Sequence, residues 1–288
     1  MQLDRTRITI RERTTFELFD LALRVVRSFA GPLFRWVLVG VLPFALLNHW
    51  VLAGNPFIYE PEQLGATYTW WLLCLVVLEM PLATAPATLY LGQVLFHQTP
   101  TRSRIFGDLA RSLPQLLVLQ GWPLAGLLFC FWIDEASITG MYVVLAMVPF
   151  CFFRFGFRPY MNEIILLERN PLSTSNATRI STPRRSKALH SWSQGELFER
   201  FLASLLFGSG LALQLCAVAW GAKSWLTGNA ELSPNVFAIL LQASLWAVVG
   251  FFAVVRFLCY LDLRIRREGW EVDLRMRAEA ARLSKELI

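Results

Sequence analysis

The sequence predicts an all-α, polytopic membrane protein with six transmembrane helices plus interfacial amphipathic helices. Three observations lead to this prediction: six long apolar stretches, 55% hydrophobic against 17% charged residues, and basic residues confined to alternate connections. Each stretch is close to the ~20 residues with which a helix crosses a bilayer. None has the polar stripe of a surface helix in a soluble domain. The predicted spans cover residues 34–53, 68–96, 113–133, 141–157, 201–220 and 236–260.

The distribution of lysine and arginine predicts how the chain threads the membrane. Of the 27 basic residues, all but Lys223 lie before residue 36, between 102 and 111, between 154 and 200, or after 255. The remaining connections are short and mainly acidic. Because basic loops are retained in the cytoplasm, both termini are expected there. The chain is thus divided into a cytoplasmic segment 1–33, a six-span bundle 34–262 with a cytoplasmic loop 158–200, and a cytoplasmic helix 263–288.

Amphipathic segments are predicted on the cytoplasmic side. Thr14 followed by Glu17 has the pattern of a capping box and predicts a helix that lies along the leaflet to about residue 30. Similar stretches precede the third and fifth spans, which suggests three units of one interfacial helix and two spans. Residues 160–168 mix apolar and acidic side chains and are predicted to lie on the membrane surface. The Ser- and Thr-rich residues 169–195 are predicted to form a mobile loop near anionic headgroups.

Glu79 is the most distinctive polar residue, because it lies near the middle of the second predicted span. A carboxylate at that depth costs several kcal/mol unless it is protonated, hydrated or paired. One interpretation is structural, with a protonated Glu79 hydrogen-bonded to a neighbouring polar side chain. The other is transport or proton handling in a cavity, since Pro81 and Pro86 leave backbone carbonyls of this span without their usual donors. The polar neighbours considered are Gln115, Gln120, Gln214 and Gln242.

Three arginines lie at the cytoplasmic ends of predicted spans. Arg35, Arg154 and Arg256 end the first, fourth and sixth spans on that side. If they converge, they form a site for an anion or a lipid headgroup. If they do not, each extends separately to the headgroups. The acids expected as counter-charges are Glu163, Glu168 and Asp262.

Small residues line one face of the fifth predicted span. Ser204, Gly208 and Ala212 recur at four-residue intervals. Such spacing lets two helices approach closely. This face is therefore expected to pack against another span of the chain or against a second copy.

Several classes of function lack support in the sequence. The basic residues are spread over four segments, which favours the lipid bilayer and its anionic headgroups as partners and argues against nucleic acid. The five cysteines include no pair at metal or redox spacing, so neither a metal site nor a disulfide is predicted. No HExxH, GxSxG or phosphate-binding loop occurs. We therefore predict no catalytic residue and no cofactor.

Three segments of the chain resemble uncharacterised bacterial six-span inner-membrane proteins. They are FELFDLA at 16–22, NEIILLE at 162–168 and YLDLRIRREG at 260–269. This group is distantly similar to the membrane domain attached to some glycerophosphodiester phosphodiesterases and to YciC-like proteins. The resemblance implies a multi-pass, all-helical protein of the bacterial inner membrane without known catalytic residues. The phosphodiesterase catalytic domain has no counterpart in the sequence, so that activity is not expected.

Three hypotheses for the function follow. The first is a non-catalytic scaffold or membrane component of a larger assembly, which binds a protein partner or a copy of itself through its cytoplasmic helices. The second is a transporter or lipid-handling protein with a cavity around Glu79. The third, an intramembrane enzyme, has the least support, because no nucleophile, base and orienting group can be named together.

Overall fold

In the residues that it describes, the computed structural model is all-helical, and four of its helices are long and apolar enough to cross a membrane. These helices coincide with the first, second, fifth and sixth predicted spans, which supports a multi-pass membrane protein. They are Ala30–Leu52, Tyr68–Leu95, Gln194–Thr227 and Pro234–Glu268. The residues described are 14–53, 66–95, 100–133, 150, 153–174, 180–191 and 193–269.

The structure does not establish the other two predicted spans. Residues 113–133 are helical throughout, but they are divided among the end of one helix, a π-helical turn and a second helix. These elements are α5 (Arg102–Leu116), η2 (Leu117–Gly121) and α6 (Trp122–Ile133). Most of the predicted span 141–157 lies outside the described residues, as do residues 270–288 of the predicted cytoplasmic helix.

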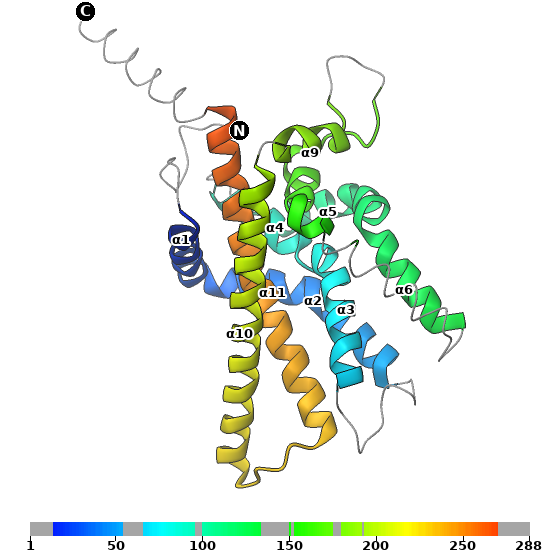
Figure 1. The fold of residues 1–288 in the computed structure, drawn as a ribbon, viewed down its shortest axis with the longest axis vertical. Coiled ribbons are helices and arrows are strands. Elements are labelled where there is room, and N and C mark those ends of the chain that lie inside the picture. The colour runs from blue at the N-terminus through cyan, green and yellow to red at the C-terminus, as the bar shows by residue number, and fades with distance from the viewer. Residues whose placement is uncertain are drawn as a thin grey trace, which may run out of the picture.

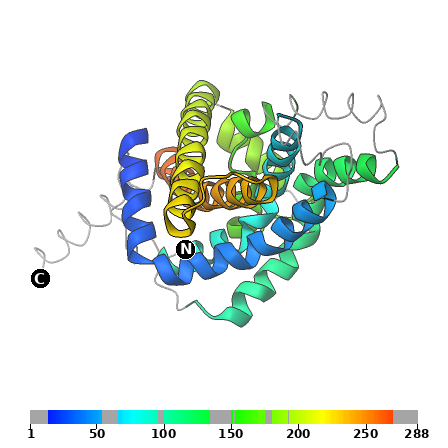
Figure 2. The same cartoon turned by 90° about the horizontal axis from the view of Figure 1, so that it is seen from below.

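Helix α1 (Thr15–Ser28) begins at the capping box that the sequence predicts. The backbone N–H of Glu17 donates to Thr14 Oγ1 at 3.4 Å, and the Thr14 N–H donates to the Glu17 carboxylate at 2.9 Å. The prediction of this helix start is therefore confirmed. One face of α1 packs against α11 (Pro234–Glu268), and Figure 2 shows α1 meeting α2 (Ala30–Ala53) at a wide angle. The buried residues of α1 are Leu18, Ala22 and Val25.

The second candidate span consists of α3 (Ala66–Ala83) and α4 (Ala85–Leu95), which meet at Thr84. The helix breaks there because Pro86 has no N–H to donate to the carbonyl four residues earlier. Every residue of α4 is buried. Helix α2 crosses this break so closely that a Cβ atom on Gly40 would lie 1.9 Å from the Ala83 carbonyl oxygen. A residue without a side chain is therefore required at position 40.

Helices α10 (Gln194–Thr227) and α11 form a long hairpin that turns at Gly228 (Figure 1). Gly228 has a φ of 67°, a conformation that glycine adopts without a steric penalty. Most of α10 is exposed, whereas more than half of the apolar part of α11 is covered by other helices. Gly208 of α10 faces Phe252 and Val248 of α11, with a would-be Cβ 3.3 and 3.6 Å from their side chains. The small-residue face of α10 therefore packs within the chain.

The prediction that residues 160–168 lie on the membrane surface is wrong. They form α8 (Met161–Glu163) and η3 (Ile164–Glu168), and Ile164, Ile165 and Leu166 are fully buried against the rest of the fold. The prediction of a loop at 169–195 is also wrong in part, because α9 (Thr182–His190) is a helix with a buried face. The acidic residues that suggested a solvent-facing segment are instead paired with arginines from distant parts of the chain.

Candidate functional site

A buried ion pair joins three elements at the α3–α4 break. The Arg256 Nε of α11 donates to Glu163 Oε1 of α8 at 2.6 Å, and its Nη2 donates to Thr84 Oγ1 at 2.9 Å. The Thr84 hydroxyl in turn donates to the Met80 carbonyl at 2.7 Å. Glu163 is 0% exposed and the Arg256 side chain 12%. The guanidinium thus holds α11, α8 and the break in one arrangement.

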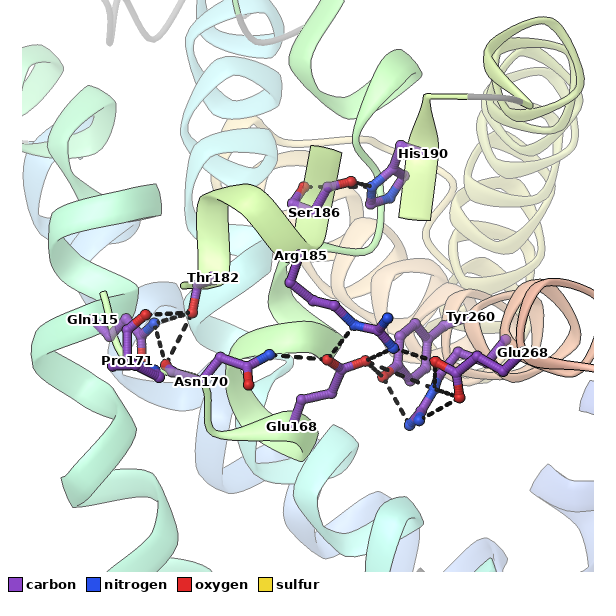
Figure 3. A network of polar contacts seen from close by, with 11 residues as sticks. Gln115, Glu168, Asn170, Pro171, Thr182, Arg185, Ser186, His190, Tyr260 and Glu268 are labelled. Carbon is purple, nitrogen blue, oxygen red and sulfur yellow. Dashed lines mark hydrogen bonds and ion pairs between the residues drawn. The ribbon is translucent and has the colours of Figure 1, made fainter. Parts of the chain in front are cut away.

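A second group, the Glu168 network, links η3, α9 and α11 (Figure 3). Glu168 accepts hydrogen bonds from Arg185 Nε at 2.6 Å and from the Tyr260 hydroxyl at 2.8 Å. Glu268 pairs with Arg264 at 2.7 Å and also contacts Arg185. The hydrogen bond that Arg185 donates to Glu168 raises the pKa of the Arg185 guanidinium above its usual range. Each charge in this network therefore has an opposite charge within the chain.

A third group, the Arg200 cluster, ties the N-terminal part of α10 to the C-terminal part of α11. Arg200 pairs with Glu196 at 2.8 Å and with Asp262 at 3.1 Å. Arg266 pairs with the same two acids, at 2.7 and 3.2 Å. Arg200 and Asp262 are buried, so the attraction between them is screened less than that of a surface pair.

The acid–amide pair, Asn48 and Glu79, joins α2 to α3 in the apolar interior. The Asn48 Nδ2 donates to Glu79 Oε2 at 2.8 Å, and both residues are 0% exposed. The other carboxyl oxygen of Glu79, Oε1, and the amide oxygen of Asn48, Oδ1, are buried without a hydrogen-bond partner. The pair lies between two helices of a buried apolar cluster that includes Leu52, Leu72 and Leu75.

The glutamines predicted as neighbours of Glu79 have other surroundings. Gln115 donates to the Asn170 carbonyl at 3.0 Å, and Gln242 donates to the Ala45 carbonyl at 2.7 Å. Gln120 reaches Asn162 Oδ1 at 3.5 Å, and Gln214 is exposed. The sequence did contain a sign of the actual partner, since Asn48 is an amide within the apolar first span.

The three arginines considered as a joint anion site have three different environments. Arg35 is exposed near the start of α2. Arg154 donates to the Leu119 carbonyl in η2, and Arg256 binds Glu163. A shared anion site built from all three is therefore not supported by their contacts. The pairing of Arg256 with a predicted counter-charge is present, but it serves to join helices.

The contact between Arg154 and Leu119 gives a hydrogen-bond donor to a carbonyl whose α-helical partner position is a proline. In an α-helix the Leu119 carbonyl would accept from residue 123, but Pro123 has no N–H. The Arg154 guanidinium donates to this oxygen instead. We expect Arg154→Met to lower the free energy of unfolding by about 1–3 kcal/mol, because a polar group is left unpaired. A double-mutant cycle measured by thermal unfolding tests this: Arg154→Met should destabilise the protein less in the Pro123→Ala background, where residue 123 has an N–H to donate. Equal destabilisation in both backgrounds would contradict this account.

His190 at the end of α9 is buried in its neutral form. Its Nδ1 lies 2.7 Å from the Ser186 carbonyl oxygen and its Nε2 lies 3.4 Å from the backbone N of Tyr160. These contacts fit a ring that donates from Nδ1 and accepts at Nε2. A second proton on Nε2 would face the Tyr160 N–H, and burial opposes the charge. Burial lowers the pKa of His190 to about 4.

This histidine predicts acid sensitivity in a defined range of pH. In the unfolded chain His190 takes up a proton near pH 6.5, whereas the folded chain resists until about pH 4, so its stabilising contribution is present above pH 6.5 and is lost as the pH falls towards 4. We expect a loss of about 2 kcal/mol between pH 7 and pH 5. Thermal unfolding in detergent at both values should show this loss in the wild type and a smaller one in His190→Asn. An unchanged pH dependence in the variant would refute the assignment.

Comparison of the chain with protein-family models, with curated proteins and with solved structures finds no match. Within the described ranges, no group of three His, Cys, Asp or Glu side chains is arranged to hold a metal ion. The class of the protein is therefore defined by its own fold, which over the described part of the chain is all-helical and contains four helices long and apolar enough to span a membrane.

Proposed function

We propose that this chain is a multi-pass protein of the bacterial inner membrane that acts without catalysis, as a platform for other components of a larger assembly. The observation that carries the proposal is the pairing of three arginines that lie largely inside the fold. Arg185, Arg200 and Arg256 each bind a carboxylate from a different element of the same chain. Charges arranged in this way hold helices in fixed positions and offer little to an anionic substrate.

The surroundings of Glu79 favour this proposal over a transporter. A transport role requires water or substrate to reach the carboxyl group. In the structure Glu79 is 0% exposed and belongs to an apolar interior. The transporter or lipid-handling hypothesis therefore finds no support at the residue on which it depends, and we do not advance it.

The proposed orientation in the membrane assigns a role to each exposed surface. The outer face of α10 carries large apolar residues, which fits contact with lipid chains. Arg184 and Lys187 project from α9, on the side predicted to be cytoplasmic. We propose that this charged side, including α9, binds the partner and that both termini share it. The exposed apolar residues of α10 include Leu205, Leu206, Phe207, Leu213, Val218 and Trp225.

Site-specific photo-crosslinking in native membranes tests the proposal. A photoreactive amino acid at Arg184 or Lys187 should give protein adducts of defined mass above the 32.9 kDa of the chain. The same amino acid at Leu206, which is 73% exposed on α10, is the matched control and should give no discrete protein adduct. Absence of adducts at α9, together with recovery of a monodisperse, partner-free monomer from native membranes, would contradict the proposal.

A further inference from the structure

The acid–amide pair leaves two buried oxygen atoms to be accounted for, one on each residue. Glu79 Oε2 accepts from Asn48 Nδ2 at 2.8 Å, while Glu79 Oε1 and Asn48 Oδ1 have no partner. Both atoms are hydrogen-bond acceptors when Glu79 is ionised. A buried acceptor without a donor costs free energy, and a buried charge costs more. These two oxygens therefore lack a donor, and protonation of Glu79 would supply one.

We propose that Asn48 and Glu79 form a proton-binding site in which Glu79 Oε1 carries the proton and donates it to Asn48 Oδ1. The two side chains then exchange two hydrogen bonds in a closed ring: amide N–H to acid carbonyl, and acid O–H to amide carbonyl. The carboxyl group is uncharged in this state, which suits an interior lined by leucine side chains. The residue that carries the proton, Glu79, belongs to α3, and the residue that accepts the hydrogen bond from it, Asn48, belongs to α2.

The chemistry of the site selects a proton over a metal cation. Calcium takes six to eight oxygen ligands and magnesium demands six in octahedral geometry. The acid–amide pair offers two unpartnered oxygens, which is too few for either ion, and the apolar cluster beside it includes Leu52, Leu72 and Leu75. A buried water that donates to both oxygens is the remaining alternative, and it would leave Glu79 ionised.

Few titratable groups lie on the elements packed around Glu79. Helix α3 itself adds Tyr68 and Cys74; α2 adds His49 and Arg35, both exposed; and α4 adds Tyr90. The described parts of η2 and α6 carry no acidic or basic residue.

The remaining helix packed on α3 is α11, and its basic residues are already paired. Arg256 reaches Thr84, five positions beyond Glu79, and is bound to Glu163. The other charged residues of α11 begin at Asp262 and belong to the Arg200 cluster, the Glu168 network or the helix end, where Arg267 bonds Ser193. The described neighbours thus provide no counter-ion for an ionised Glu79.

Infrared difference spectroscopy of the purified protein in lipid tests the proposal directly. Near neutral pH, the wild-type spectrum minus that of Glu79→Gln should contain the carbonyl band of a protonated carboxylic acid. The band should shift in Asn48→Leu, which removes the acceptor of the acid proton. Glu163→Gln is the matched control, because Glu163 is equally buried but paired with Arg256, so its difference spectrum should show the loss of carboxylate bands and no band of a protonated acid.

A second measurement needs no variant to fold. In wild-type protein labelled with ¹³C-glutamate, the band should shift with the label and disappear as the pH is raised. The proposal is overturned if the glutamate signals near neutral pH are those of ionised carboxylates alone, which is the result expected for a water-bridged Glu79. It is also overturned if a protonated band is present but survives unchanged in Glu79→Gln.

Discussion

Replacement of Arg256 by alanine is expected to lower the free energy of unfolding by about 3–5 kcal/mol. The substitution leaves Glu163, which is fully buried, with no opposite charge, and it removes the donor to Thr84 Oγ1. The effect should exceed the value of the ion pair itself, because an uncompensated buried charge is the larger penalty. Reversible unfolding in mixed detergent micelles measures the difference.

An arginine in a surface pair is the matched control for this experiment. Arg24 pairs with Asp20 at 2.7 Å within α1, and the two side chains are 75% and 60% exposed. Because such pairs are screened by solvent, Arg24→Ala should change stability by no more than about 0.5 kcal/mol. The double variant Arg256→Met with Glu163→Leu should recover much of the lost stability, since the charge is removed with its partner. If Arg256→Ala and Arg24→Ala lowered the free energy of unfolding equally, the buried pair would not stabilise the fold in the way described.

The second large effect is expected at Gly40, where alanine should destabilise the protein by more than about 3 kcal/mol. The new Cβ would lie 1.9 Å from the Ala83 carbonyl oxygen and 3.2 Å from Pro86 Cδ. These are atoms of the backbone and of a rigid ring, so neither can move aside without separating α2 from the α3–α4 break. Thermal unfolding in detergent would detect the loss.

Gly31 provides a control within the same helix. It also belongs to α2, but a Cβ atom there meets nothing within 4 Å. Gly31→Ala should therefore stabilise the protein by about 0.5–1 kcal/mol through the helix preference of alanine. If both substitutions stabilise the protein, α2 does not lie against Ala83 as described.

Much of the helical framework could be predicted from local patterns. The start of α1 follows from the reciprocal hydrogen bonds of Thr14 and Glu17, which involve residues three positions apart. The four long helices follow from the length of their apolar stretches. Both properties depend on neighbours along the chain, and the sequence displays those neighbours directly.

The interior around η3 could not be predicted in this way. Glu163 and Glu168 suggested a segment on the membrane surface, and their burial is stabilised by Arg256, Arg185 and Tyr260, which lie at least 17 positions away. The same limit applies to Glu79, whose partner Asn48 is 31 positions earlier. Each polar residue was recognised as unusual, but the identity of its partner depends on how helices are arranged in space.

The complete enclosure of α4 has a consequence for how the protein is made. Its neighbours include α11 and η3, which leave the ribosome well after α4 itself. Thr84 and Gln93 must therefore enter the bilayer before the elements that will surround them have been synthesised. The early helices therefore cannot reach their final packing until the last hairpin, α10 and α11, has been inserted. The insertion of this hairpin is the step that completes the interior.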